Sequence, residues 1–183
     1  KDGVLPSVTI DNISASYEGT KYLLDKGLSK PAFIGVKQDT MNAWGDRFVG
    51  FEKALEEEGI NIDEELLYFD NLKVKTGYEA VEKFIGSNKK FDSIVCASDE
   101  IAIGAINKLR EKGYNVPEDI SVIGFNNNHV SSYFYPRITT ISQPSYDMGS
   151  VAMRMLIKLL NKKELEQGHY VLDYQLIQRE STK

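Results

Sequence analysis

Polar side chains gather in four stretches of the sequence, and each stretch follows a short apolar run with the character of a β-strand. In an open parallel sheet, ligands bind outside the carboxyl ends of the strands, so these stretches are where a binding site is expected. The four stretches hold Lys37, Gln38, Asp39, Asn42, Trp44 and Arg47; Asp70 and Asn71; Ser98 and Asp99; and Asn126, Asn127, Asn128 and His129. We therefore expect a polar binding surface along that edge of the sheet.

The side chains of this edge suit a neutral sugar. A sugar presents neighbouring hydroxyl groups, each both donor and acceptor, and an apolar C–H face, so planar bidentate groups and an aromatic platform hold it. Arg47 and Asn126 are planar groups of this kind, and Trp44 is an aromatic platform. These three residues are candidate ligand contacts.

Each candidate also has a simpler explanation. Arg47 stands in the first turn of a predicted helix and would there be a surface cation, and Trp44 would be a lid over the core. The three consecutive asparagines would be only a turn, because asparagine tolerates left-handed backbone geometry. Asp99 would be a helix cap, a role that is compatible with ligand binding. The sequence leaves these alternatives open.

The elements that must position these residues alternate between strand and helix, which is typical of a parallel sheet covered by helices on both faces. Several strands are apolar on both sides, as buried parallel strands are. The predicted strands are Ser7–Ile10, Ala32–Val36, Leu66–Phe69, Ser93–Ala97 and Ser121–Phe125, with Tyr170–Ile177 as an edge strand. The fold class is therefore α/β, and residues from about Pro31 to Ile141 form one self-consistent unit.

Five amphipathic segments predict helices whose apolar stripes face a core. Thr76 followed by Glu79 predicts a capping box, and Ser98 or Asp99 caps the next helix. Glycines follow several of these segments as natural helix ends. The predicted helices cover Ser14–Lys26, Gly45–Glu58, Thr76–Ile85, the stretch from Ser98 or Asp99 to Gly113, and Ser145–Leu160.

The composition, with 42% hydrophobic and 27% charged residues, is that of a globular protein, and no window approaches the roughly 18 to 20 apolar residues of a bilayer span. A net charge of −5 without a basic stripe argues against DNA binding by this segment alone. Cys96 is the only cysteine and lies in an apolar run, which fits a reducing, cytoplasmic compartment. The abrupt start at Lys1, without an initiator methionine, indicates a piece of a longer protein.

Three stretches of the sequence are distinctive in combination: Asp119–Asn126 (DISVIGFN), Pro136–Pro144 (PRITTISQP) and Met148-Gly149. In these stretches the chain resembles the LacI/GalR family of transcriptional repressors. Supporting matches are Ser98–Ala105, Arg47–Phe51, Tyr22-Leu23-Leu24 with Gly27, and the closing Arg179-Glu180-Ser181. Each motif is weak by itself, but their combination is highly specific and covers nearly the entire chain.

The resemblance implies a three-layer, Rossmann-like subdomain of a fold similar to periplasmic sugar-binding proteins, with remnants of a second subdomain. Residues 1–28 and 143–160 would belong to a partial N-terminal subdomain, and residues 29–142 and 161–183 to the C-terminal, effector-binding one. The helix-turn-helix DNA-binding domain would be absent, and DNA would be bound only through it. Loss of part of the N-terminal subdomain would expose apolar faces of the helices Ser14–Lys26 and Ser145–Leu160.

Effector contacts of the family fall on Arg47, Asn126, Ser98 and Asp99, which with Trp44 make up the predicted site. Many members have aspartate where this chain has Asn126, so its effector need not be theirs. The segment with Met41, Ala43 and Trp44 does not match purine-responsive members, which favours a carbohydrate effector. The resemblance also implies a homodimer whose DNA binding the effector controls.

Two other classes of protein are the alternatives. An extracytoplasmic sugar-binding protein of an ABC transporter shares the architecture, and an export signal upstream of Lys1 would favour it. An α/β enzyme is disfavoured, because the sequence has no G-x-S-x-G, G-x-x-x-x-G-K or G-x-G-x-x-G motif and its two histidines, His129 and His169, lie far apart. We expect no catalytic residue, no cofactor, no metal and no contact with a membrane.

Overall fold

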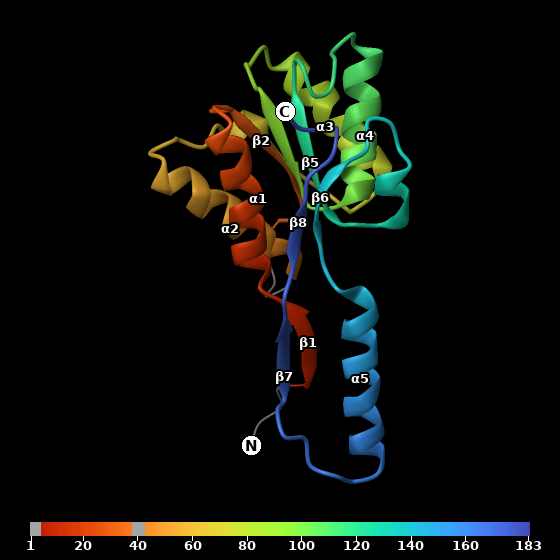
Figure 1. The fold of residues 1–183 in the computed structure, drawn as a ribbon. Helices are drawn as coiled ribbons and strands as arrows, with labels where there is room; N and C mark the ends of the chain where they lie inside the picture. Colours follow the sequence, from red (N-terminus) through yellow and green to blue (C-terminus); the bar gives the residue numbers. More distant parts are fainter. Residues whose placement is uncertain (1–4, 38–42) are drawn as a thin grey trace.

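A computed structural model of the chain describes residues 5–37 and 43–183 and confirms the α/β class. The main sheet has the strand order β3-β2-β4-β5-β6-β8, and β1 and β7 form a separate pair (Figure 1). The elements are β1 (Ser7–Ile10), α1 (Asn12–Asp25), β2 (Pro31–Gly35), α2 (Ala43–Glu57), η1 (Glu64–Leu66), β3 (Leu67–Phe69), α3 (Val74–Gly86), β4 (Ser93–Cys96), α4 (Asp99–Glu111), β5 (Ser121–Asn126), η2 (His129–Ser132), β6 (Thr139–Ser142), α5 (Ser145–Leu160), β7 (His169–Leu172) and β8 (Gln175–Ile177). Neighbouring strands of the main sheet are parallel except β8, which runs antiparallel to β6.

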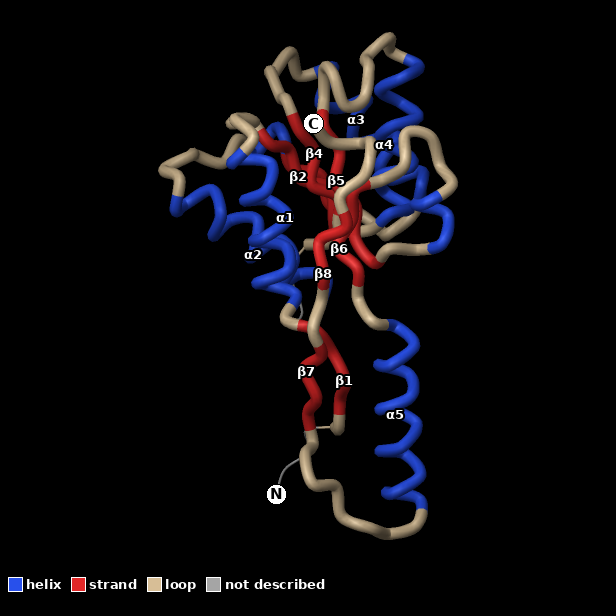
Figure 2. The backbone as a smooth tube through the Cα atoms, viewed as in Figure 1, coloured by secondary structure: helices blue, strands red, loops and turns tan. Residues whose placement is uncertain are grey.

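Helices bury both faces of the main sheet, which is why its central strands are mostly apolar. Helices α1 and α2 pack together on one face, and α3 and α4 pack together on the other (Figure 2). Every residue of β2 and β4 is buried, which confirms two predicted buried strands. The predicted core stripe of α4, Ala102, Ile106 and Leu109, is fully buried. None of the helices in residues 5–37 and 43–183 is long and apolar enough to cross a membrane.

The predicted capping box at Thr76 is wrong. Helix α3 begins two residues earlier, at Val74, and no side chain caps its first turn. Thr76 is buried inside the helix, and its hydroxyl donates to Oδ1 of Asn71 at 3.0 Å. The threonine therefore holds the loop that precedes the helix instead of beginning the helix.

The predicted edge strand Tyr170–Ile177 is two strands in two sheets. β7 pairs with β1 in parallel, whereas β8 pairs with β6 at the edge of the main sheet. Between them, Asp173 and Tyr174 carry the chain from one sheet to the other. Alternation of polar and apolar residues continues through the crossing, so the pattern cannot show that the pairing partner changes.

Residues 5–10 and 143–172, with β1, α5 and β7, extend away from the main sheet, and we call them the protruding part (Figures 1 and 2). The subdomain boundaries that the resemblance implies do not coincide with the packing of the elements. Helix α1 lies against α2, and its Leu23 belongs to the main core, so α1 goes with the main sheet. β7 goes with the protruding part, because it pairs with β1.

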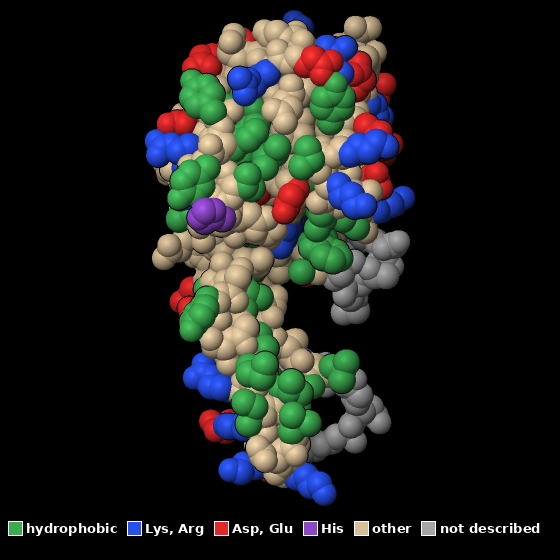
Figure 3. Space-filling view, turned by 90° about the vertical axis from the view of Figure 1, so that its right-hand side faces the viewer, with side chains coloured by type: hydrophobic (Ala, Val, Ile, Leu, Met, Phe, Trp, Pro, Cys, Tyr) green, Lys and Arg blue, Asp and Glu red, His purple; other side chains and the backbone are tan. Residues whose placement is uncertain are grey.

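The expected exposed apolar face is wrong for α1 and confirmed for α5. Ala15 and Leu23 of α1 are fully buried against the main body, whereas Met155 is the only buried residue of α5. Figure 3 shows hydrophobic side chains gathered on the protruding part. The exposed large apolar side chains of α5 are Tyr146, Met153, Leu156, Ile157, Leu159 and Leu160.

We expect residues 1–183, prepared alone, to self-associate through α5, because contiguous exposed apolar surface drives association. Sedimentation velocity over a range of concentrations measures this. Replacing Leu156 and Leu160 with glutamine should shift the protein toward the monomer, while Arg154→Gln on the same helix should change little. A chain that stays monomeric at every concentration would contradict the expectation.

Candidate functional site

Arg47 brings α2 to the carboxyl ends of β4 and β5. Its Nε donates to Oδ1 of Asn12 at 3.0 Å, and its Nη1 donates to the carbonyl of Ala97 at 2.5 Å. The guanidinium lies over the ring of Phe125, 3.6 Å from its centre. The side chain is 3% exposed, so the alternative of a surface cation is wrong.

Burial lowers the pKa of Arg47 to about 9, and the nearby carboxylate of Asp99 opposes this shift. Arg47 therefore remains a cation at neutral pH, held among neutral acceptors in a region of low dielectric constant. The two hydrogen bonds and the ring contact fix its plane at the sheet edge. A fixed cation of this kind can orient a hydroxyl or an anionic group of a ligand.

Ser98 and Asp99 lie at the junction between β4 and α4 and have different roles. Ser98 caps the helix, because its Oγ accepts from the backbone N–H of Ile101 at 3.2 Å. Asp99 accepts instead from the hydroxyl of Thr140 and from the backbone N–H of Asn128, each at 2.6 Å. The alternative in which Asp99 caps α4 is therefore wrong, and Asp99 holds the loop after β5.

Asp99 is fully buried. Burial raises the pKa of its carboxyl to about 6, while the hydrogen bonds from Thr140 and Asn128 lower it. Close packing makes this burial possible, since a Cβ at Gly124 would lie 2.4 Å from Oδ1 of Asp99. A larger residue at that position of β5 would displace the carboxylate.

The loop after β5 has the turn geometry that three asparagines predict, and it also carries polar groups toward the protruding part. Asn126 and Asn127 have positive φ angles of 101° and 54°. Oδ1 of Asn126 accepts from Nε2 of Gln143 at 3.1 Å, and Nδ2 of Asn127 donates to Oγ of Ser142 at 3.1 Å. Ser142 ends β6, and Gln143 follows it in the connection to α5.

Sequence reasoning missed Gln143 and Arg179 as parts of this site. Nη2 of Arg179 donates to Oδ1 of Asn127 at 2.6 Å, and its Nη1 donates to Oγ of Ser131 and the carbonyl of Ile138. Both residues lie in the family motifs, so a signal was present. Their hydrogen-bond partners, however, are 17 and 52 residues away along the chain.

Not every residue of the predicted site lies in the cluster around Arg47, Asp99 and Asn126. Trp44 lies in the first turn of α2 and is 45% exposed, so its role as an aromatic platform stays a prediction. Asp70 and Asn71 are exposed at the end of β3. Four residues that follow β2 in the sequence, Gln38, Asp39, Met41 and Asn42, lie outside the described residues.

Charged and polar groups of three kinds meet at this edge. It offers a fixed cation at Arg47, an amide pair at Asn126 and Gln143, and a buried carboxylate at Asp99. Within residues 5–37 and 43–183, no group of three or more His, Cys, Asp or Glu side chains is arranged to hold a metal. His129 begins η2 outside this cluster, and its ring is tilted by 41° against that of Tyr133.

The chain matches the family of the periplasmic binding protein-like domain over residues 20–182. It is 66% identical over 182 residues to the HTH-type transcriptional regulator RegA of Clostridium saccharobutylicum, covering 100% of this chain and 55% of that protein. It is 34% identical over 180 residues to catabolite control protein A of Priestia megaterium, covering 98% of this chain and 54% of that protein. The chain thus spans about half the length of the curated relatives it matches.

Solved structures of transcription regulators share the fold of this chain. The transcription regulator CcpA of Lactococcus lactis superposes with a TM-score of 0.90 at 38% identity, covering 97% of this chain and 65% of that one. The transcriptional regulator CelR, solved as a complex with cellobiose, also has a TM-score of 0.90, at 30% identity, covering 97% of this chain and 54% of that one.

Proposed function

Because the chain belongs to the periplasmic binding protein-like domain family, in the form found in LacI/GalR-type transcriptional regulators, we propose that it senses a small-molecule effector for such a regulator. The observation that carries the proposal is the meeting of Arg47, Asp99 and Asn126 at one edge of the main sheet, beside the segment that leads to α5. The effector controls binding of the whole protein to operator DNA through a separate helix-turn-helix domain. The chain itself catalyses no reaction.

A carbohydrate is the effector that this edge favours. The amides of Asn126 and Gln143 can each donate and accept, as neighbouring sugar hydroxyls require, and the Arg47 cation can add a bond to a hydroxyl or phosphate oxygen. The cellobiose complex of CelR supports the same class of ligand. Trp44, which is half exposed at the start of α2, would supply the apolar platform.

The coupling runs through the loop after β5. Asn126 is hydrogen-bonded to Gln143, in the short connection between β6 and α5, and Asn127 is hydrogen-bonded to Ser142, the last residue of β6. An effector that takes over the amide of Asn126 releases Gln143, and so favours one arrangement of the protruding part over another. Such differential affinity is what shifts a conformational equilibrium.

The protruding part belongs, in this proposal, to a second subdomain that the rest of the regulator completes. Its exposed α5 face and the two-stranded β1–β7 pair are the surfaces that further chain would cover. The cleft between the two subdomains would then enclose the edge that carries Arg47 and Asn126. The regulator is expected to act in the cytoplasm as a homodimer, which sedimentation of the full-length protein tests.

All the relatives and structures named above are transcription regulators, which favours a regulator over the binding protein of a transporter. The buried, unpaired Cys96 fits the same choice, because it needs no oxidising compartment. Detection of specific operator binding by the full-length protein would separate the two directly.

Asn126→Gly in the full-length protein is expected to abolish most of the response to the effector. The change removes the amide but keeps a residue that accepts the φ of 101°, so loss of binding is not caused by backbone strain. A thermal-shift screen against mono- and disaccharides and their phosphates should find one stabilising ligand, whose affinity the variant lowers by about tenfold or more.

The matched control is Asn88→Gly, an asparagine with a positive φ of 58° outside the site. It should leave the ligand response unchanged. Arg47→Ala is a poorer test, because Arg47 is buried and its loss leaves the acceptors of Asn12 and Ala97 without this donor. A panel in which no sugar or sugar phosphate stabilises the protein would refute a carbohydrate effector.

A further inference from the structure

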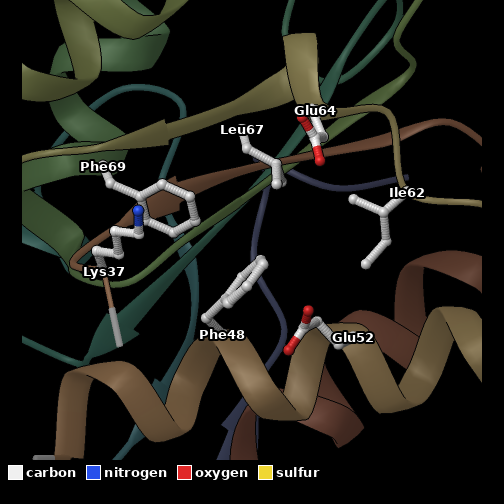
Figure 4. A pocket seen from close by; sticks show the side chains of 7 residues that line it. All are labelled: Lys37, Phe48, Glu52, Ile62, Glu64, Leu67 and Phe69. Atoms are coloured by element: carbon white, nitrogen blue, oxygen red, sulfur yellow. The ribbon is translucent and has the colours of Figure 1, made fainter. Parts of the chain in front are cut away.

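A groove lies between α2 and β3, and neither Arg47 nor Asn126 is among the residues that line it (Figure 4). β3 is the outermost strand of the main sheet and pairs with β2. Phe48 and Glu52 reach the groove from successive turns of α2, and Leu67 and Phe69 reach it from one face of β3. The groove has a volume of about 580 Å³.

The floor of the groove is apolar. The rings of Phe48 and Phe69 meet edge to face, with their centres 5.0 Å apart. Leu67 lies beside them, and Ile62 extends the floor toward η1. A partner that covers this floor removes aromatic and aliphatic surface from water, which is favourable at roughly 25 cal/mol per Å².

The groove continues along α2. A second hollow of about 640 Å³ shares Glu52 and Ile62 with the first and runs on to Gly59, Ile60 and Asn61 at the end of the helix. The two hollows therefore form one elongated surface. Its length suits an extended chain better than a compact molecule.

Two carboxylates on the groove walls have no ion-pair partner in the part of the chain that the structure describes. Figure 4 shows Glu52 and Glu64 on opposite walls with their carboxylates turned toward the hollow. Asp63 and Glu65, next to Glu64, both pair with Lys89, whereas neither Glu52 nor Glu64 forms an ion pair among the described residues. Partial burial, and then the nearby carboxylate of Glu56, raise the pKa of Glu52 above its ordinary value, and a cation placed beside Glu52 would stabilise its charged form.

The charge changes sign at the other end. Lys37 lies beside Phe69, at the far end of the first hollow from Ile62 (Figure 4). A basic group is thus favoured between Glu52 and Glu64, and an acidic group near Lys37. This order of charges gives the groove a direction.

The geometry points to a docking site for an extended segment of a partner protein, in which an arginine or lysine lies between Glu52 and Glu64 and a neighbouring apolar side chain covers Phe48 and Phe69. Such a segment advances about 3.3 Å per residue, so a few residues span the groove and alternate side chains enter it. A small amine would fill one hollow and leave most of its surface in water, whereas small-ligand sites bury most of their ligand. The lining of the groove includes none of the residues proposed to bind the effector.

The test uses the full-length protein and a fluorescein-labelled nonapeptide that alternates leucine with arginine, followed by fluorescence anisotropy. The wild type is expected to bind this peptide more tightly than one that alternates leucine with glutamate. The double variant Glu52→Gln and Glu64→Gln should weaken binding of the arginine peptide by about tenfold, because both carboxylates face its cation. These residues are exposed or half-buried, so the variant should keep the thermal stability of the wild type.

The control is Glu164→Gln, which removes one negative charge from an exposed position near the end of α5. It should leave the affinity unchanged. The proposal is overturned if the double variant binds within about twofold of the wild type, or if Glu164→Gln weakens binding as much, since the attraction would then be general. It is also overturned if the arginine peptide does not bind, or if spermidine displaces it at equal concentration, which would assign the groove to a free polyamine.

Discussion

Replacing Gly104 with alanine is expected to lower the free energy of unfolding by about 3 kcal/mol, because the added methyl group cannot fit between α3 and α4. A Cβ at Gly104 would lie 1.8 Å from the backbone oxygen of Val74. Gly77 makes the reciprocal contact, since its Cβ would lie 1.9 Å from the oxygen of Ile101. Backbone atoms cannot turn aside as a flexible side chain can, so the two helices would have to separate.

Gly86→Ala is the matched control for this prediction. Gly86 ends α3, its Cβ would meet nothing within 4 Å, and its φ is not in the positive range. Alanine there should be neutral or stabilise the protein by up to about 1 kcal/mol, because it restricts the unfolded chain. Urea unfolding of the three proteins measures the differences. Equal stabilities for Gly104→Ala and Gly86→Ala would show that α3 and α4 are not in this close contact.

The stability of the wild type is expected to fall, relative to Asp99→Asn, as the pH rises from 4 to 7. The pKa of Asp99 is about 6 in the folded protein and 3.8 is its ordinary value, so between these values the folded state holds a proton that the unfolded chain has lost. Ionisation at higher pH then costs the folded state more than the unfolded one. Roughly two pKa units correspond to about 3 kcal/mol.

Asparagine is a suitable replacement because it preserves the shape of the contacts. Its amide oxygen can accept from the N–H of Asn128, and its amide nitrogen can donate to Oγ1 of Thr140, whose hydroxyl can turn toward the carbonyl of Ile141 at 3.5 Å. Glu100, which raises the pKa of Asp99, and Arg179, which lowers it, are present in both proteins.

Urea unfolding at pH 4 and pH 7 measures the effect, with Asp173→Asn as an exposed control that should show no such difference. A fall in the stability of the wild type relative to Asp99→Asn between pH 4 and pH 7 would confirm the prediction. If the wild type and Asp99→Asn keep a constant difference across this range, the Asp99 carboxyl ionises with an ordinary pKa, and its burial does not disfavour the charge.

Local pattern determined much of this protein. Strands such as Pro31–Gly35 and Ser93–Cys96 were found within two residues of their ends, because a buried strand between turns needs only nearby residues to identify it. The same holds for the apolar stripe of α4 and for the turn geometry at Asn126 and Asn127. The family and its polar sheet edge were likewise present in short motifs.

Tertiary structure alone decided how these parts meet. Asp99 bonds to residues 29 and 41 positions away, and Arg47 bonds to residues 35 and 50 positions away, so their roles as loop anchor and buried cation have no local signal. The sequence does not show that the chain passes from one sheet to the other between β7 and β8. Both strands alternate polar and apolar residues, and this alternation does not determine which strand each of them pairs with. The spacing of apolar residues within an element determines which of its faces is apolar. Contacts between segments that are distant in the sequence determine what that face packs against.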